Sequence, residues 1–493
     1  MVNRLYQILF AFLFVGFLSL CSCYSDNVAD SPTIPLRFSV DTLRFDTVFT
    51  QVGSATRSFK IYNDLEEAVI INDLQLDNPT TSFFRLNADG FSANTVENLR
   101  IEPLDSIYIF AEVTIDPDMP LSVSPFIIEE YVNITANQSN YKVLLEAFGQ
   151  NANYVPSRSS NGDVNLYTCE MGTWEWTDPR PYVIYGALFI DSCRLVIPEG
   201  QNVYVHGGIA INDLGIYNDG LLIFLQHGSL SANGTLDNPI TFQTDRLEEE
   251  FSEVSGQWAG IVFSQGSVFN SIEHTTIKNS IIGISIDSSA QISIKSSTIA
   301  HTSGSGITAS NATIYCENSL IYDNGSYGIS LNFGGEYDFN YCTVANYDNQ
   351  DQALFMNNLK CYDADCFENK VLRLRSQFTN CILVGNDDDE IALFDATNGE
   401  QPELFDYKLE NSIVIVDELI DADNYPFFFE NCINCENIER RDTLFVDLDN
   451  YDLHLDTLSV AIDKAKPIPI LLDKDGNARE SDFPDIGCFE YQK

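Results

Sequence analysis

Apolar and polar residues alternate in short runs along residues 272–344, and the runs return at a fixed interval. A small residue recurs every 22 or 23 residues, and a glycine followed by isoleucine keeps the same spacing. The first series is Thr275, Ser297, Ser319 and Cys342, and the second is Gly283, Gly306 and Gly328. Because two separate series share one period, the pattern predicts a solenoid in which each repeat forms one coil.

Within each repeat, apolar positions alternate with polar ones over segments such as 282–286 and 291–294. This two-residue period is typical of β-strands, and glycine and asparagine mark the corners between them. The leucine ladder and the helix-forming segments of a leucine-rich repeat are missing. We therefore expect an all-β chain in which residues 165–470 form a parallel β-helix. Each strand would pair with its equivalent in the next coil, about 4.8 Å away.

The repeat continues less regularly after residue 344. Its small residue returns at Cys381, Ser412 and Cys432, at intervals of 39, 31 and 20 residues. The longer intervals predict loop insertions at 347–372 and 387–407, with the coil itself preserved. Insertions in a solenoid emerge on its faces and often form the binding face.

Residues 36–150 show a different all-β pattern, with short strands separated by turns rich in Asp, Asn and Pro. The predicted strands are 43–45, 58–62, 69–71, 106–113, 131–134 and 143–145. Strands of this number over such a length indicate an immunoglobulin-like (Ig-like) β-sandwich. The order of segment 45–49, then Gly53 and Ser54, then segment 60–63 resembles the ASH-type Ig-like domains of bacterial surface proteins. That resemblance implies a spacer or docking module.

The charge balance limits the possible partners. With 26 Lys and Arg against 72 Asp and Glu, the formal net charge is −46. Such a surface repels phosphate backbones, so we expect no nucleic-acid partner. Because 44% of the residues are hydrophobic, the chain is not a disordered acidic tail. We expect no cofactor and no dedicated metal site, and calcium is the cation that this acidic surface would recruit.

The N-terminal segment is typical of an exported protein. One cation, Arg4, precedes the apolar run 8–20, which has the length of a signal peptide and is short for a bilayer span. Residues 20–23 resemble the lipobox of bacterial lipoproteins, with Cys23 acylated and Cys21 as the alternative. The resemblance implies a signal peptide at 1–22, a tether at 23–35 and a lipid anchor in the outer membrane. The protein would then lie on the cell surface of a Gram-negative bacterium.

Two further motifs resemble a family of bacterial surface proteins. Residues 256–261, Gly-Gln-Trp-Ala-Gly-Ile, match the turn that opens the regular coils of right-handed parallel β-helix repeat proteins. Residues 475–479 and 485–491 resemble the closing segment called choice-of-anchor Q. The resemblance implies a right-handed β-helix with a C-terminal cap at 471–493, joined to the sandwich by a linker at 151–164. It implies an architecture and no particular activity.

Export permits disulfides, and two pairs of neighbouring cysteines are candidates. Cys361 and Cys366, in the first insertion, are the preferred pair, and Cys432 and Cys435 are the second choice. The second pair has the spacing of zinc or redox motifs, but no further Cys or His pair accompanies it at metal spacing. We therefore expect no metal centre there.

Charged residues near the insertions allow an enzymatic interpretation. Many β-helix proteins are polysaccharide lyases or glycoside hydrolases, which hold an acidic polysaccharide in a groove. A lyase uses carboxylates that bind calcium and a basic residue that removes a proton, whereas a hydrolase uses two carboxylates. The candidates are Arg373, Arg375, Asp387, Asp388, Asp389 and Glu390. In so acidic a chain, a run of four acidic residues is more often a solvated turn.

We favour a non-catalytic surface lipoprotein. In this hypothesis the sandwich holds the acidic β-helix away from the membrane, and the β-helix binds glycan or another surface protein. Exposed aromatic side chains would stack on sugar rings. The candidates are Tyr322, Tyr327, Tyr337, Tyr341 and Tyr347. Packing of the same tyrosines against the coils is the alternative.

Overall fold

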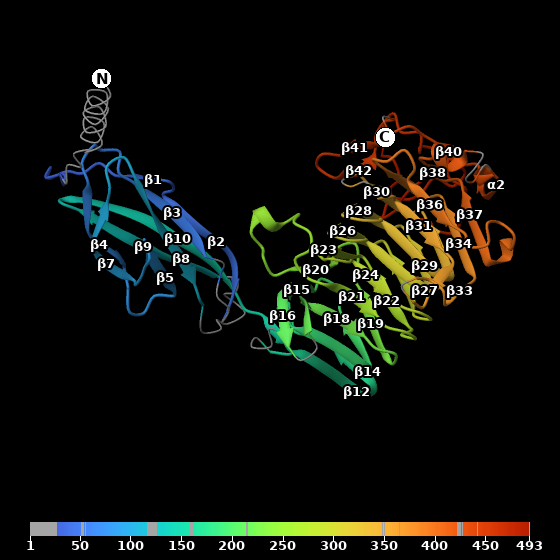
Figure 1. Ribbon diagram of the computed structural model, residues 1–493, viewed down its shortest axis with the longest axis horizontal. Helices are drawn as coiled ribbons and strands as arrows, with labels where there is room; N and C mark the ends of the chain where they lie inside the picture. The colour runs from blue at the N-terminus through green and yellow to red at the C-terminus, as the bar shows by residue number, and fades with distance from the viewer. Residues whose placement is uncertain are drawn as a thin grey trace, which may run out of the picture. The chain divides into compact units, whose positions relative to one another are not determined.

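The computed structural model describes residues 27–492 except 51–53, 55, 116–125, 158–161, 213–214, 348, 350, 364, 422–424, 426 and 441. The chain divides into two compact units, Met1–Asn151 and Ala152–Lys493. Both units are built from β-strands (Figure 1), as the alternating pattern predicts. The signal segment and Cys23 lie outside the described residues. Within the described residues, no helix is long and apolar enough to cross a membrane.

The first unit is an Ig-like β-sandwich. Its described strands are β1 (Arg37–Phe38), β2 (Thr42–Phe49), β3 (Arg57–Tyr62), β4 (Val69–Leu76), β5 (Phe84–Ala88), β6 (Phe91–Ser92), β7 (Thr95–Ile101), β8 (Ser106–Val113), β9 (Phe126–Ala136) and β10 (Ser139–Gln150). They form two five-stranded sheets, β1-β3-β8-β5-β6 and β2-β10-β9-β4-β7, around one apolar core. The predicted strands do not include β1, β5, β6 or β7. In β7 the alternation breaks at Asn98, whose φ is positive.

One face of the second unit is a parallel sheet of eleven strands, as far as the structure describes the chain. In spatial order these are β11 (Asn153–Val155), β13 (Tyr182–Tyr185), β15 (Asn202–His206), β20 (Ile240–Thr244), β23 (Thr275–Lys278), β26 (Thr298–Thr302), β28 (Leu320–Asn324), β30 (Thr343–Asn346), β35 (Ile382–Gly385), β38 (Ile413–Val414) and β40 (Glu436–Asn437). The spatial order follows the chain order. Each strand therefore pairs with its equivalent one repeat later, as Ile277 of β23 does with Ile299 of β26.

A second parallel sheet, of fifteen strands in the described chain, carries the rest of each repeat. Its strands are β12 (Val164–Glu175), β14 (Ala187–Ile197), β18 (Leu221–Phe224), β19 (Gly228–Asn233), β21 (Gly260–Phe263), β22 (Asn270–Glu273), β24 (Ile284–Ile286), β25 (Gln291–Lys295), β27 (Ile307–Glu317), β29 (Ile329–Asn340), β31 (Leu354–Asn357), β34 (Leu374–Thr379), β36 (Ile391–Phe394), β37 (Phe405–Glu410) and β39 (Cys432–Ile433). Long strands serve two partners, since the first part of β27 pairs with β24 and its last part with β25. Alternate apolar residues of both sheets point inward into one core.

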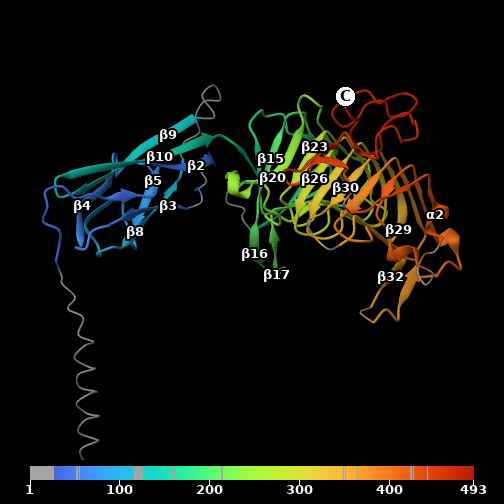
Figure 2. The ribbon, with the colours of Figure 1, turned by 90° about the horizontal axis from the view of Figure 1, so that it is seen from above.

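Hairpins and short helices complete the described part of the second unit. They are β16 (Gly208–Asn212) with β17 (Gly215–Asp219), β32 (Leu359–Cys361) with β33 (Asn369–Val371), β41 (Phe445–Asp447) with β42 (Asp452–Leu455), α2 (Phe428–Asn431), and the 3-10 turns η2 (Glu249–Phe251), η3 (Pro402–Leu404) and η4 (Glu418–Ile420). The hairpin of β32 and β33 lies in the first predicted insertion. It forms an arm that projects from the stacked strands (Figure 2).

The repeating small residues form a column, as the sequence predicts. The backbone N–H of Thr275 donates to Ser297 Oγ at 3.2 Å, and that of Ser297 donates to Ser319 Oγ at 3.3 Å. Just before each small residue, one corner residue in the left-handed conformation turns the chain from one sheet to the other. These corner residues are His274, Ser296, Asn318, Tyr341, Asn380, Asn411 and Asn434, with φ between 42° and 59°. Asparagine is frequent there because it tolerates this conformation better than most residues.

The C-terminal segment covers a side of the second unit. After β40, the chain runs over the eleven-stranded sheet (Figure 1), and its apolar residues pack on the outward face of that sheet. This second core includes Leu320, Ile382, Ile413, Leu444, Phe445, Leu455, Ile486 and Phe489. Segment 471–493, which we expected to close the end of the solenoid, thus lies along the sheet instead. The outward-facing apolar residues of the strands require such a cover.

Two features that were not predicted from the sequence attach residues 153–193 to the parallel sheets. Residues 153–155, expected in the linker at 151–164, form β11 and pair with β13. A disulfide between Cys169 and Cys193 joins β12 to β14. Their separation of 24 residues is close to one repeat, and this spacing was the signal that would have paired them.

Candidate functional site

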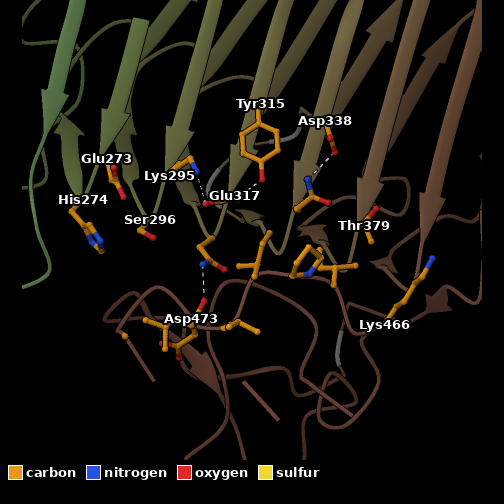
Figure 3. Close-up of a pocket in the computed structure, with 18 of the residues that line it drawn as sticks. Glu273, His274, Lys295, Ser296, Tyr315, Glu317, Asp338, Thr379, Lys466 and Asp473 are labelled. Atoms are coloured by element: carbon orange, nitrogen blue, oxygen red, sulfur yellow. Dashed lines mark hydrogen bonds and ion pairs between the residues drawn. The ribbon is translucent and has the colours of Figure 1, made fainter. Parts of the chain in front are cut away.

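A groove of about 770 Å³ lies between the C-terminal ends of strands of the fifteen-stranded sheet and a C-terminal segment (Figure 3). We call residues 464–473 the strap. On the sheet side, the groove runs past the ends of β22, β25, β27, β29, β34 and β37. Residues from six strands therefore meet a segment that follows them by up to 200 residues in the chain, as between Glu273 and Asp473.

The sheet side of the groove is a wall of polar side chains in two rows. Parallel register places equivalent residues of neighbouring strands about 4.8 Å apart. The row at the strand ends is Glu273, Lys295, Glu317, Asn340, Thr379 and Glu410, and the row two residues earlier includes Tyr315, Asp338 and Gln377. Each successive strand thus presents hydrogen-bonding groups to the groove at equivalent positions, one strand spacing apart.

Ion pairs and hydrogen bonds position the side chains of this wall. Lys295 Nζ lies 3.0 Å from Glu317 Oε1, and Tyr315 Oη donates a hydrogen bond to the same carboxylate. Burial raises the pKa of Tyr315, and the carboxylate of Glu317 raises it further, so the phenol stays protonated. Near the strap, Lys466 Nζ lies 3.1 Å from Glu410 Oε1.

The opposite wall of the groove is apolar and is held by corner asparagines. Asn318 Nδ2 donates to the carbonyl oxygen of Leu472 at 2.8 Å. Asn380 binds the backbone of Lys466 twice, because its Nδ2 donates to the carbonyl oxygen and its Oδ1 accepts the N–H, both at 2.8 Å. The apolar strap residues fixed in this way are Ile468, Pro469, Ile470, Leu471 and Leu472.

A buried charge network anchors the segment behind the strap. The Arg479 side chain is 2% exposed, and its Nη1 lies 3.3 Å from Glu490 Oε2. Its Nη2 donates to Asn318 Oδ1 at 2.9 Å and to the carbonyl oxygen of Gly487 at 3.0 Å. The guanidinium carbon lies 3.7 Å from the centre of the Tyr341 ring. These contacts hold the segment that follows the strap against two corner residues, Asn318 and Tyr341.

The turn that follows the strap is closed by hydrogen bonds to a carboxylate. Asp473 is 2% exposed, and its Oδ1 accepts the N–H groups of Asp475 and Asn477 at 2.9 and 2.7 Å. Its Oδ2 accepts the N–H of Glu490 at 2.9 Å. The described residues contain no group of three or more His, Cys, Asp or Glu side chains arranged to hold a metal ion.

Several carboxylates of the groove are engaged with neighbours. Glu317 is bound by Lys295 and Tyr315, and Asp338 Oδ1 accepts a hydrogen bond from Asn340 Nδ2 at 2.8 Å. Burial by itself would raise the pKa of Glu410, but Lys466 and Lys408 lower it. A general acid at neutral pH needs a carboxyl group with a raised pKa. Glu410 therefore lacks the raised pKa that a general acid needs.

The acidic run 387–390 forms a turn that does not line the groove. Glu390 is fully buried and accepts two backbone N–H groups at 2.7 and 2.8 Å. Burial raises its pKa to about 7. Asp389 also accepts two backbone N–H groups, and Asp388 forms an exposed ion pair with Arg440 at 3.4 Å. The carboxylates of Asp389 and Glu390 thus stabilise turns between coils.

Arg373 and Arg375 lie apart from that turn. Arg373 precedes β34 and Arg375 lies within it, in the fifteen-stranded sheet, whereas 387–390 follows β35 in the eleven-stranded sheet. In the part of the chain that the structure describes, no ion pair joins either arginine to the acidic run. The six candidate catalytic residues therefore do not form one constellation.

The tyrosine candidates are divided between the core and the surface. Tyr337 and Tyr341 are 4% and 1% exposed, so the expectation that they stack on a ligand is wrong. Tyr337 belongs to the inner core of the coils, whereas Tyr341 belongs to the outer core under the C-terminal segment, with its ring against Arg479. Tyr327 is half-buried and stacks on Phe355, with ring centres 4.9 Å apart.

Tyr322 and Tyr347 are half-buried against the outer core and line a pocket outside the groove. With Tyr451 they line a volume of about 290 Å³. The tyrosine that lines the groove itself is Tyr315, which sequence reasoning missed. Its outward position in the alternation of 307–317 was the signal that would have found it.

The two expected cysteine pairs form disulfides. Cys361 joins Cys366 across the tip of the arm, and Cys432 joins Cys435. The parallel register places Cys432 opposite Leu409. Leu409 lies three residues before Ser412, the small residue of that coil. Cys435 therefore occupies the column of small residues. Our alignment of Cys432 with that column was wrong, because the short strand β39 hides the true register.

Comparison with known proteins identifies no family for this chain. No family model matches it, and no curated protein matches it. The ASH/PapD-like domain of human CEP192 is 9% identical with a TM-score of 0.16, and the match covers 27% of this chain and 94% of that one. The Salmonella enterica SafA pilin in complex with the SafB chaperone is 10% identical with a TM-score of 0.17, and the match covers 25% of this chain and 58% of that one.

A solved structure similar to a larger part of the chain is an enzyme. The catalytic unit of the GH87 alpha-1,3-glucanase from Streptomyces thermodiastaticus is 9% identical with a TM-score of 0.24. The match covers 72% of this chain and 78% of that one. With TM-scores this low, none of these likenesses carries a conclusion about function.

Proposed function

We propose that this protein is a non-catalytic, membrane-anchored surface lipoprotein whose second unit binds an extended, uncharged glycan in the groove. The observation that carries the proposal is the contrast between the two walls. Rows of polar side chains from successive strands face the apolar strap residues 468–472. A sugar chain matches this contrast, because its hydroxyl groups repeat along the chain while its ring faces are apolar.

We further propose that the second unit is a right-handed parallel β-helix. Support comes from the parallel pairing of each strand with its equivalent one repeat later. The small-residue column and the left-handed corners add to it. In such a solenoid the groove lengthens with the number of coils, which suits a polymeric ligand.

The charge of the groove selects against an acidic ligand. Its lining includes five acidic side chains against two lysines. The acidic members are Glu273, Glu317, Asp338, Glu410 and Asp473. An acidic polysaccharide would be repelled there. The alternative function, a lyase or hydrolase that acts on an acidic polysaccharide in a groove of the β-helix, therefore has less support.

Filling the groove is expected to weaken glycan binding. Gln377 is exposed on β34 and lines the groove, so a Gln377→Trp side chain would occupy the space of the ligand without disturbing the core. We expect a loss of affinity of at least about tenfold, the effect of one well-placed contact. The measurement is calorimetry of the full chain with a panel of neutral oligosaccharides.

The matched control is Gln291→Trp, which adds the same side chain to an exposed position of the same sheet outside the groove lining. It should bind as tightly as the unaltered protein. Equal binding by both variants, or no binding to any neutral glycan, contradicts the proposal. Release of reducing or unsaturated sugars from the panel contradicts its non-catalytic part.

The membrane anchor rests on the lipobox-like residues 20–23, with Cys23 as the acylated residue. We expect Cys23→Ser to abolish incorporation of labelled palmitate and to move the protein from the membrane fraction to the soluble fraction. Cys21→Ser is the control and should leave both unchanged. Labelling that persists in Cys23→Ser and disappears in Cys21→Ser would assign the lipid to Cys21.

A further inference from the structure

A second pocket lies where the turn between β41 and β42 packs against the outward face of the eleven-stranded sheet (Figure 1). Its volume is about 290 Å³, which suits a small molecule or a single chemical group. We call it the tyrosine pocket. From β28 and β30 it is lined by Tyr322, Ala345 and Tyr347, and from the turn and β42 by Leu448, Asp449, Tyr451 and Leu453.

The aromatic rings of this pocket are held in place by their neighbours. The ring centres of Tyr322 and Tyr451 lie 5.2 Å apart, with the ring planes tilted by 40°. The His301 side chain is 6% exposed and lies edge-on to both rings, with centres 5.3 and 5.2 Å away. His301 Nδ1 is in turn hydrogen-bonded to the carboxylate of Asp323. The rings are therefore positioned before any ligand binds, which lowers the entropy cost of binding.

The turn that carries Leu448, Asp449 and Tyr451 is fixed as well. Asp447 Oδ1 accepts the backbone N–H groups of Asp449 and Asn450 at 3.1 and 3.3 Å, and its Oδ2 accepts Asn450 Nδ2 at 2.8 Å. Tyr451 follows with a φ of 55°, in the left-handed region, which is unfavourable for a bulky residue. Backbone strain of this kind concentrates at ligand-binding sites.

The electrostatic environment of the rings is negative. Burial raises the pKa of Tyr322 to about 12, and the carboxylates of Asp323 and Glu253 contribute to the shift. Burial also raises the pKa of Tyr347, with a contribution from Glu390. Both phenols therefore stay uncharged at neutral pH. Among the described residues that line the pocket, none is a lysine, an arginine or a histidine, so the site attracts a cation.

The composition of the wall selects among cations. Calcium takes six to eight oxygen ligands, whereas this lining holds one carboxylate, Asp449, beside rings and aliphatic side chains. A quaternary ammonium group carries its charge under methyl groups, which suit Ala345, Leu448 and Leu453. Its charge is attracted to the faces of aromatic rings, and several rings around one such group form an aromatic cage.

We propose that the tyrosine pocket binds a quaternary ammonium group, with the rings of Tyr322, Tyr347 and Tyr451 around the cation and Asp449 beside it. A free compound such as choline and a phosphocholine headgroup both carry this group. The pocket is separate from the groove, so the proposal does not rest on the function proposed for the groove.

The test is calorimetric titration of the full chain with choline, with its neutral isostere 3,3-dimethylbutan-1-ol and with phosphocholine, at constant ionic strength. We expect choline to bind at least about tenfold more tightly than the isostere, because only the cation gains from the rings and the carboxylate. Tighter binding of phosphocholine than of choline would assign the pocket to a headgroup, and the reverse order to a free compound. Equal binding of choline and the isostere, or no binding of either ammonium compound, overturns the proposal.

Two substitutions of Tyr347 test the role of its ring. Tyr347→Phe keeps the ring and should retain choline binding. Tyr347→Leu removes the ring and should weaken choline binding at least about tenfold. Equal choline binding by the two variants overturns the proposal. Thermal unfolding of both variants shows whether the loss of the contact between Tyr347 and Phe445 disturbs the fold.

A variant at Asp449 tests the charge without touching the core, because this side chain is exposed. Asp449→Asn should weaken choline binding about threefold, the effect of one exposed charge, and leave the thermal midpoint unchanged. The matched control is Asp237→Asn, at an exposed position of the same unit outside the pocket lining, and it should bind choline as the unaltered protein does. Equal weakening in Asp449→Asn and Asp237→Asn would show that choline responds only to the overall charge, and this result overturns the proposal.

Discussion

Replacement of Arg479 by methionine is expected to lower the free energy of unfolding by about 3–5 kcal/mol, the usual cost of removing one partner of a buried ion pair. Glu490 would remain buried without its cation, since its side chain is 4% exposed. The carbonyl oxygen of Gly487 and Asn318 Oδ1 would lose their donors. Chemical denaturation monitored by circular dichroism measures the change.

The pH dependence of this variant has a defined sign. Burial raises the pKa of Glu490 already in the unaltered protein, although Arg479 opposes that shift. Removing the arginine raises the pKa further, so the folded variant takes up a proton more readily than the unfolded chain. Its stability deficit should therefore shrink as the pH falls towards the pKa of Glu490 and grow as the pH rises.

Two control variants separate burial from charge. Lys464→Met removes an exposed ion pair with Glu436, in which both side chains are about half exposed, and should change stability little. Arg479→Met/Glu490→Gln removes the unpaired charge and should recover part of the loss. A deficit of Arg479→Met no larger than that of Lys464→Met would show that the network does not anchor the C-terminal segment.

Replacement of Asn380 by alanine is expected to lower the free energy of unfolding by about 3 kcal/mol. About 2 kcal/mol comes from the two hydrogen bonds to the backbone of Lys466, at roughly 1 kcal/mol each. About 1 kcal/mol more comes from the corner, because Asn380 has a φ of 59°, where alanine is strained. Glycan binding in the groove should fall as well, since Asn380 holds the strap.

Comparison variants divide these two contributions. Asn380→Gly keeps the freedom to adopt the left-handed corner and should lose only the part due to the hydrogen bonds. Asn398→Ala changes an exposed asparagine with a φ of 50° in a loop far from the strap in sequence, so it should show only the smaller conformational cost. Equal stability of Asn380→Ala and Asn398→Ala would mean that the asparagine does not fasten the strap.

The repeat could be predicted because it depends on interactions between residues that are close in the sequence. Alternation decides which side chains of a strand face the core, and one small residue per coil follows each left-handed corner. Thr275, Ser297 and Ser319 hydrogen-bond in series, as their spacing predicted. The prediction weakened where coils carry insertions, and it misplaced Cys432 by three residues. There the local signal is a strand of two residues, Cys432–Ile433.

The candidate site was not predictable in the same way. The acidic run 387–390 drew attention through its charge, yet its carboxylates close turns by accepting backbone N–H groups. The groove residues Lys295, Tyr315 and Gln377 carry no motif, and only the register of the parallel strands brings them to one wall. Tyr322 and Tyr347 stood out as aromatic residues, but only the fold brings Tyr451 beside them.

By itself, the sequence determined that the chain is all-β, that an Ig-like sandwich precedes repeating coils, and that small residues stack from coil to coil. These properties follow from contacts within a strand or between neighbouring repeats. Only the tertiary structure decided where the strap lies, because its hydrogen bonds join residues as far apart as Asn318 and Leu472, 154 positions along the chain. The local sequence does not distinguish an asparagine that only forms a corner from one that also binds a distant backbone. The groove could therefore not be predicted from the sequence.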